Sequence, residues 1–166
     1  MTQDTASGGF ARPGHDHAAC VRRALDHAEA HCETQGLRLT DTRRRVLEII
    51  CQRHEPAKAY DILEQLGDEG RRAAPPTVYR ALDFLLDACL VHRIDSLNAY
   101  VACAHPAPRH SAQLLVCSHC EQVAEIEDPK IQAVLVQGAS KLGFQIDHQT
   151  VEIHGCCPRC QSKQVG

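Results

Sequence analysis

Hydrophobic residues recur at helical spacing in three successive stretches of the N-terminal half. Between residues 17 and 35, apolar positions repeat every three or four residues, and Gly36 follows where a helix would end. Thr40 suits the N-cap of a second helix, which continues to about Arg53. A third, shorter pattern covers about Ala59 to Leu66. The pattern therefore predicts three helices before residue 70.

A fourth helix follows two prolines, Pro75 and Pro76, which are tolerated in a first helical turn. Its apolar positions lie on one face: Val78, Ala81, Leu82, Leu85 and Leu86. Thr77, Tyr79 and Arg80 lie on the opposite, polar face. Beyond Ala88 the pattern changes to two short strands, Leu90–Asp95 and Ala99–Ala102, which predict a hairpin.

Helices followed by a β-hairpin are typical of a winged helix-turn-helix domain, which places one helix in the major groove of DNA. Base contacts would then come from the start of the fourth helix, at Thr77, Tyr79 and Arg80. Arg43 and Arg45 would contact the phosphate backbone. The alternative is that these residues are ordinary solvated side chains of a small helical domain.

The C-terminal half alternates strand and helix patterns. Strands are predicted at 112–116 and 122–127, a helix from the Asp128-Pro129 cap to about residue 142, and a last strand at 144–153. The fold class is therefore α+β, with an N-terminal winged helix-turn-helix domain and a C-terminal α/β domain. The expected organisation is a disordered N-terminus at 1–15, a DNA-binding domain at 16–102, a hinge at 103–110 and an α/β domain at 111–166.

The composition narrows the function classes. The 166 residues have a formal net charge of −3, which excludes a uniformly basic nucleic-acid coat but allows a local basic patch. No apolar run is long enough to span a membrane, and the polar N-terminus lacks the apolar core of a secretory signal. A cytoplasmic, reducing setting is expected. There, 10 Cys and 11 His indicate metal ligands rather than a disulfide framework.

Two Cys-x-x-Cys turns carry the strongest chemical signal. Cys117 and Cys120 form one turn, and Cys157 and Cys160 form the other. Each turn brings two sulfurs to one side of a metal, and two such turns complete the four-thiolate tetrahedron that zinc prefers. A saturated site of this kind is structural. Cys156 adjoins Cys157, so a pairing through Cys156 stays open at this point. Redox dithiols are the competing interpretation.

A second, more scattered set combines His92, Cys103, His110 and Glu125. One thiolate, two imidazoles and a carboxylate would suit tetrahedral zinc, and the cysteine disfavours iron and manganese. If these four residues meet, the metal would join the two domains across the hinge. By pattern alone, His92 could equally be a strand residue satisfied by a hydrogen bond, and Cys103 a small buried side chain.

Three segments together closely resemble the ferric uptake regulator (Fur) superfamily, and within it the zinc-uptake-regulator branch. They are PPTVYRALDFLLDACLVHRIDSLNAYVAC, then a histidine that six residues separate from CSHC, then HGCCPRC. The likeness covers roughly residues 20 to 160. It implies a dimeric, metal-dependent repressor that binds operator DNA through its winged helix and forms a homodimer through its C-terminal domain. Tyr79 and Arg80 fall on the DNA-reading positions of the family.

The resemblance also assigns the metal ligands, which imply two zinc ions per chain. Cys117, Cys120, Cys157 and Cys160 fall on the structural zinc ligands. His92, Cys103, His110 and Glu125 fall on the regulatory zinc ligands. Zinc at the regulatory site is expected to hold the dimer in a DNA-binding geometry and so repress zinc-uptake genes.

Several alternatives compete with a zinc-responsive repressor. A Fur-type repressor of iron, manganese or nickel is the nearest, although the segment 103–110 lacks the fuller histidine cluster of iron-sensing relatives. A zinc-dependent hydrolase would need an open metal position and a general base, and the chain contains no HExxH motif. A thiol oxidoreductase would place its Cys-x-x-Cys at a helix N-terminus, whereas both pairs are expected at strand ends. The chain is therefore not expected to be an enzyme.

Overall fold

The computed structural model describes residues 10, 16–53, 55–70, 74–107, 112–147 and 149–164. They form two compact units. One unit ends at Pro108, and the other joins Phe10 to the residues from Ala112 onward. The predicted disorder of residues 1–15 lies outside the described residues, apart from Phe10, and so do residues 108–110 of the predicted hinge. Helices and two separate sheets confirm the α+β class.

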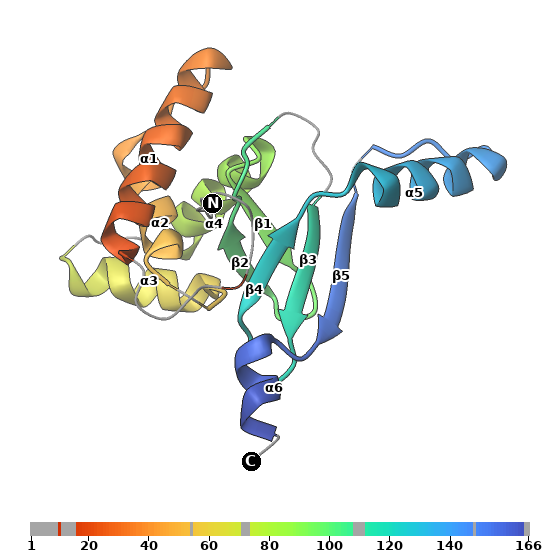
Figure 1. Cartoon of the computed structure of the whole chain (residues 1–166). Coiled ribbons are helices and arrows are strands. Elements are labelled where there is room, and N and C mark those ends of the chain that lie inside the picture. The colour runs from red at the N-terminus through yellow and green to blue at the C-terminus, as the bar shows by residue number, and fades with distance from the viewer. Residues whose placement is uncertain are drawn as a thin grey trace. The chain divides into compact units, whose positions relative to one another are not determined.

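Four helices and a hairpin make up the N-terminal unit (Figure 1). Their bounds are α1 His17–Thr34, α2 Asp41–Cys51, α3 Ala59–Asp68, α4 Pro75–Asp87, β1 Val91–Ile94 and β2 Ala99–Ala102. Asp16 caps α1 by accepting a hydrogen bond from the Ala19 N–H, and Thr40 caps α2 by accepting one from Arg43. The predicted helices and hairpin are confirmed to within a few residues.

The core of this unit lies where the helices face one another. Its fully buried side chains are Val46, Leu47, Ile49, Ile62, Leu66, Val78, Leu82 and Leu85. These are the positions that the helical spacing selects, because one stripe of each helix must be removed from water. The hairpin is tied to the same core: Ala57 and Tyr100 exchange two backbone hydrogen bonds of 2.8 Å. This packing fixes α4 against α2 and α3 and leaves its polar face outward.

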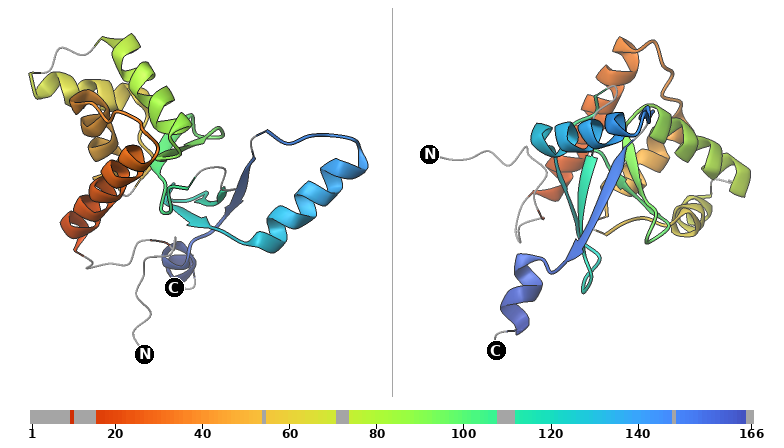
Figure 2. Two further views of the ribbon diagram at one scale, coloured as in Figure 1. Left: turned by 90° about the horizontal axis from the view of Figure 1, so that it is seen from above. Right: turned by 90° about the vertical axis from the view of Figure 1, so that its right-hand side faces the viewer.

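A three-stranded sheet with two helices forms the C-terminal unit. Its elements are β3 Ala112–Cys117, β4 Val123–Ile126, α5 Pro129–Lys141, β5 Thr150–Gly155 and α6 Pro158–Gln164. The strand order is β4-β3-β5, with β3 antiparallel to β4 and parallel to β5. Parallel pairing requires a crossover connection, which α5 supplies. Figure 2 (left) shows α5 lying apart from the three strands.

Two features of this unit differ from the sequence prediction. The last strand begins at Thr150 rather than at residue 144, because β3 begins at Ala112, which pairs with Thr150. Within the described residues, the positions before Thr150 have no strand beside them. The strand also continues to Gly155, and a further helix, α6, follows it. Helix α6 was not predicted, since its seven residues lack an apolar stripe; only Pro158 at its start fits a helix.

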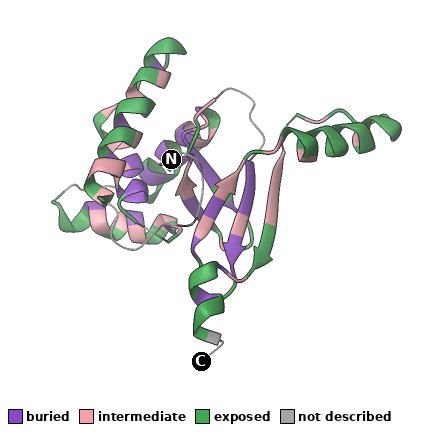
Figure 3. Cartoon of the chain, in the orientation of Figure 1, coloured by how far each residue is buried: buried purple, intermediate pink, exposed green. Residues whose placement is uncertain are grey.

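Helix α5 stands out because none of its residues is buried (Figure 3). Large apolar side chains on it and just after it are exposed: Val134, Leu135, Val136, Leu142 and Phe144. Leu142 is 85% and Phe144 is 66% exposed. Several large apolar side chains exposed on one element are typical of an interaction site.

Candidate metal centres and nucleic-acid interface

The N-terminal part of α4 presents an exposed polar face. Thr77, Tyr79 and Arg80 are exposed, whereas Val78 between them is 1% exposed and anchors the helix to the core. No side chain caps the start of α4. Pro75 and Pro76 carry no N–H, and the N–H groups of Thr77 and Val78 donate to the Ala74 carbonyl oxygen, so side chains rather than the backbone supply the donors here. This face has the shape and the donors that a DNA-reading helix needs.

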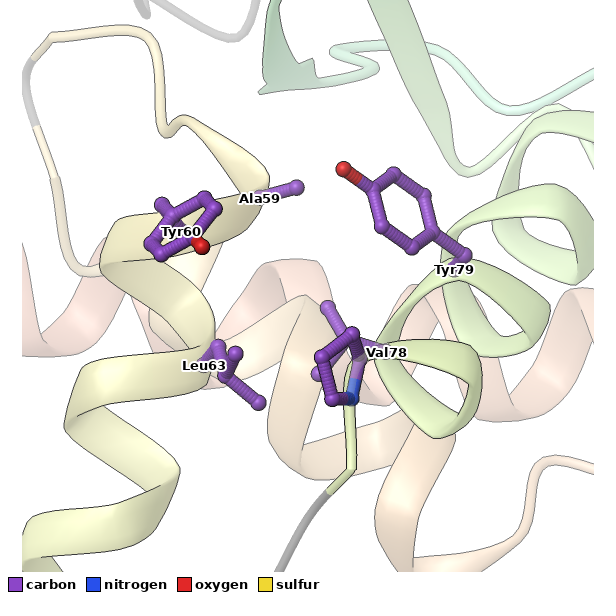
Figure 4. Close-up of a pocket in the computed structure, with 6 residues that line it drawn as sticks. Ala59, Tyr60, Leu63, Val78 and Tyr79 are labelled. Carbon is purple, nitrogen blue, oxygen red and sulfur yellow. The ribbon is translucent and has the colours of Figure 1, made fainter.

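Tyr60 is a neighbour of this face that the sequence reasoning missed. It lies at the start of α3 and is 79% exposed, and with Tyr79, which is 49% exposed, it lines a shallow apolar pocket (Figure 4). The other lining residues are Ala59, Leu63, Pro75 and Val78. The chain has only three tyrosines, and Tyr60 lies near the start of a predicted helix. That position was the signal in the sequence that could have identified it.

The two arginines predicted to contact phosphates both have partners within the fold. The Arg43 guanidinium lies 3.6 Å from the centre of the Phe84 ring and donates a 2.7 Å hydrogen bond to the Arg38 carbonyl oxygen. Arg45 forms ion pairs with Glu48, at 2.7 Å, and with Glu69. The hydrogen bonds that Arg45 donates to the Glu69 carboxylate raise the pKa of Arg45. Both arginines thus brace α2 against neighbouring elements.

The four sulfurs of Cys117, Cys120, Cys157 and Cys160 lie within 4.8 Å of one another. Cys117 ends β3, Cys120 lies in the turn after it, Cys157 follows β5, and Cys160 lies in α6. Glu121 has a φ of 56°, which lets the turn fold back so that its N–H reaches the Cys117 carbonyl oxygen at 2.9 Å. Parallel pairing of β3 with β5 brings the two turns to the same end of the sheet.

This cluster fits zinc by its donor set and its dimensions. Zinc–sulfur bonds of about 2.3 Å in a tetrahedron place sulfurs about 3.8 Å apart. The Cys120 and Cys157 sulfurs are 3.7 Å apart. The backbone N–H of Cys157 donates to the Cys117 sulfur at 3.4 Å and lowers the pKa of that thiol to about 6. A thiolate at neutral pH is the form that binds a metal.

Part of the second predicted set also comes together. His92 on β1 and Cys103 just after β2 belong to the same hairpin and are 8% and 7% exposed. A ring nitrogen of His92 and the Cys103 sulfur lie within 4.8 Å of each other. The Cys103 N–H donates to the Leu90 carbonyl oxygen at 3.0 Å, which extends the hairpin by one pair. One imidazole and one thiolate therefore face a common point.

The other two members of that set lie elsewhere in the chain. Glu125 belongs to the C-terminal unit, on β4 opposite Leu114, and is half-buried. His110 lies outside the described residues. One expectation is wrong: the Cys157–Cys160 pair does not lie in a turn at a strand end, because Cys157 directly precedes α6 and Cys160 lies within it. The location of the Cys157–Cys160 pair therefore no longer argues against a thiol oxidoreductase.

A winged-helix unit joined to an α/β unit with a four-thiolate cluster defines a class of protein, the metal-dependent DNA-binding regulators. The chain belongs to the ferric uptake regulator family, whose sequence profile matches residues 34–154. It is 37% identical over 141 residues to the zinc uptake regulation protein of Escherichia coli K12, covering 84% of this chain and 82% of that protein.

Solved structures agree with this family membership. A zinc uptake regulator complexed with zinc and DNA is 35% identical, with a TM-score of 0.83, over 88% of this chain and 98% of that one. The crystal structure of holo XcZur is 42% identical, with a TM-score of 0.78, over 83% and 96%. In the described part of the chain, no helix has the length and apolar character needed to cross a membrane.

Proposed function

We propose that this protein is a zinc-responsive transcriptional repressor that binds operator DNA as a homodimer and represses zinc-uptake genes. The observation that carries the proposal is the likeness, over nearly the whole chain, to a zinc uptake regulator complexed with zinc and DNA. The four-sulfur cluster and the exposed face of α4 supply the two binding functions that such a regulator requires. Acting on operator DNA, the protein works in the cytoplasm.

Two zinc ions per chain are proposed, with different tasks. Cys117, Cys120, Cys157 and Cys160 hold a structural ion, since four thiolates leave no open position for a substrate. That ion fastens α6 and the end of β5 to the β3–β4 turn, in a unit too small to rely on its apolar core alone. Because a zinc ion with four protein ligands has no open coordination position, this site disfavours a zinc-dependent hydrolase.

The regulatory ion is proposed to bind His92, Cys103, His110 and Glu125. Support comes from the paired imidazole and thiolate of the first two residues, both buried at the end of the hairpin. Glu125 offers a half-buried carboxylate on the other unit, and His110 follows the segment that connects the units. A thiolate in the set favours zinc over iron or manganese.

Filling the regulatory site would couple the two units. A ligand set drawn from both units restrains their relative motion, and this sets the separation of the two DNA-reading helices in the dimer. Half-sites lie one or more helical turns apart on the same face of DNA, so the separation decides whether both helices can bind. Zinc and DNA affinities are then linked reciprocally, typically by about 1–3 kcal/mol or roughly 5–150-fold.

DNA contact is proposed for Thr77, Tyr79 and Arg80 on α4, and we add Tyr60 from α3. Arg80 reads a base edge, because a guanidinium can make two hydrogen bonds to guanine. Tyr60 and Tyr79 present their rings and hydroxyls to the groove or to the phosphates. Some N–H groups of Arg43 and Arg45 already bind partners within the fold, and only the remaining ones can contact phosphates. These two arginines therefore contribute less to DNA affinity than Arg80.

Dimerisation is proposed to occur through α5 and the edge strand β5. The exposed apolar side chains Val134, Leu135, Val136, Leu142 and Phe144 would be removed from water by the same face of a second copy. Strand β5 is an edge of the sheet, and its Ile153 is 43% exposed. A second copy that covers this face would bury the exposed apolar side chains and would also cover the open edge of β5.

The test is an operator gel shift titrated with buffered free zinc, and in parallel with iron, manganese and nickel. Zinc should promote binding at the lowest free concentration, with two zinc ions counted per chain. A shift driven equally by iron, manganese or nickel would favour the Fur-type alternative. A shift that needs no metal would leave only a DNA-binding protein stabilised by its structural zinc.

A further inference from the structure

A fifth thiol lies beside the four-sulfur cluster. Cys156 and Cys157 are the only two residues between β5 and α6, and both are cysteines. The Cys157 sulfur belongs to the set of four, and the Cys156 sulfur does not. Cys156 is nevertheless half-buried, and it packs against Cys117, Cys157 and Cys160. Its thiol lies 3.8 Å from the Cys157 carbonyl oxygen.

The peptide group between these two cysteines is held from both sides. Its carbonyl, from Cys156, accepts a 2.7 Å hydrogen bond from the Gln161 side chain on α6. Its N–H, from Cys157, donates to the Cys117 sulfur. The Cys157 carbonyl oxygen in turn accepts bonds of 3.0 Å from the N–H groups of Cys160 and Gln161. None of these bonds involves the Cys157 sulfur, so the peptide stays against the cluster whichever neighbouring side chain binds the metal.

We propose that Cys156 is a reserve zinc ligand, which replaces Cys157 when that thiolate leaves the structural zinc. The inference rests on the four-thiolate zinc site of the proposed function. Two residues separate Cys157 from Cys160, and three separate Cys156 from Cys160. Cys156 and Cys157 are adjacent in the connection before α6, and the half-buried Cys156 packs against the same cysteine cluster. Either pair can therefore present two sulfurs to the same ion.

The exchange conserves charge and needs no oxidant. The Cys156 thiol gives up its proton and forms the zinc–sulfur bond, while the bond from Cys157 breaks and its sulfur takes up a proton. Four thiolates bind the ion before and after. The structural unit thereby keeps its metal when Cys157 is blocked, whereas loss of a cysteine that has no neighbouring thiol leaves the site one ligand short.

The experiment measures cobalt(II) binding, because its absorption reports the number of thiolate ligands. All variants carry Cys103→Ser, so that every cobalt–sulfur band arises from the cysteine cluster. The test variants are Cys157→Ser, Cys157→Ala, Cys156→Ser and the double Cys156→Ser/Cys157→Ser. Cys160→Ser is the reference for a ligand without a reserve, and Cys20→Ser on α1 is the control for a half-buried thiol elsewhere.

Cys157→Ser and Cys157→Ala should keep the four-thiolate spectrum and weaken the metal affinity only about tenfold, the size expected when a supporting residue is lost. Cys156→Ser and Cys20→Ser should bind as the parent does. The double variant and Cys160→Ser should lose the four-thiolate spectrum. The proposal is overturned if both Cys157 variants, folded or not, lose the spectrum as Cys160→Ser does. A parent protein without any four-thiolate spectrum would instead contradict the structural zinc site itself.

Discussion

The backbone N–H of Cys157 donates a hydrogen bond to the Cys117 sulfur across 3.4 Å, and the two residues are 40 positions apart in sequence. This bond joins the turn after β3 to the connection between β5 and α6. It also places a positive partial charge beside a sulfur that must carry negative charge to bind zinc. The metal site is thus partly organised by the backbone of the residue that supplies another ligand.

The first prediction concerns the pH dependence of the metal-free protein. The Cys157 N–H lowers the pKa of Cys117 from 9.0 to about 6. A pKa that is lower in the folded chain adds stability that is complete above pH 9 and is lost as the pH falls towards 6. The free energy of unfolding should therefore rise between these pH values. Chemical unfolding of the metal-free protein at several pH values measures this rise.

Burial works in the opposite direction on Cys160, whose pKa is raised to about 12. A raised pKa stabilises the folded chain below pH 9, and that contribution is lost only at higher pH. It does not mask the Cys117 effect in the lower range. An unfolding free energy that is flat from pH 6 to 9 in the unmodified, metal-free protein would contradict the assigned hydrogen bond.

The second prediction separates the two proposed zinc sites. Cys117→Ser should unfold the C-terminal unit or abolish dimerisation, because structural zinc supplies about 10–16 kcal/mol in small zinc-binding peptides. Cys103→Ser and His92→Ala should leave a folded dimer whose operator affinity no longer rises with zinc, a loss of roughly 5–150-fold. Circular dichroism, light scattering and gel shifts on the same samples distinguish these results. Normal zinc-dependent DNA binding by Cys103→Ser would show that the regulatory assignment is wrong.

The third prediction addresses base reading. Arg80→Ala should cost about 1–3 kcal/mol of operator affinity and relax the sequence preference at one base pair. Arg22 on α1 is also exposed, and Arg22→Ala is the matched control. Tyr60→Ala should weaken operator binding without changing the melting temperature, since the side chain is largely in water. Binding to a panel of single-base operator variants measures the preference, and an unchanged panel for Arg80→Ala would exclude it as a base-reading residue.

The fourth prediction tests the dimer surface on α5. Val134→Glu places a charge among exposed apolar side chains. It should weaken the dimer by about 2 kcal/mol or more, roughly 30-fold in Kd. Ala30→Glu makes a similar change on an exposed position of α1 and should leave the dimer intact. Sedimentation equilibrium compares the two variants, and equal dimer stability would place the interface elsewhere.

Periodicity in the sequence was enough to predict most elements. The apolar stripes of α2 and α4 and the caps at Thr40 and Asp128 are local signals, readable within a few residues. The start of β5 was not readable in this way, because a strand exists only where a neighbour offers hydrogen bonds, and Ala112 is the first such neighbour among the described residues. Phe144 fits the apolar pattern of a strand, but it lies before β5 and is 66% exposed.

The functional residues divide in the same way, between those that local sequence spacing predicts and those that only the tertiary structure brings together. The sequence by itself determined the two Cys-x-x-Cys pairs and the polar face of α4, since both depend on spacings of two to four residues. Only the tertiary structure decided that the two pairs meet, that Cys157 rather than Cys156 belongs to the set of four sulfurs, and that Tyr60 lies beside Tyr79. Those relationships arise from strand pairing and helix packing between distant segments, and no local spacing encodes them.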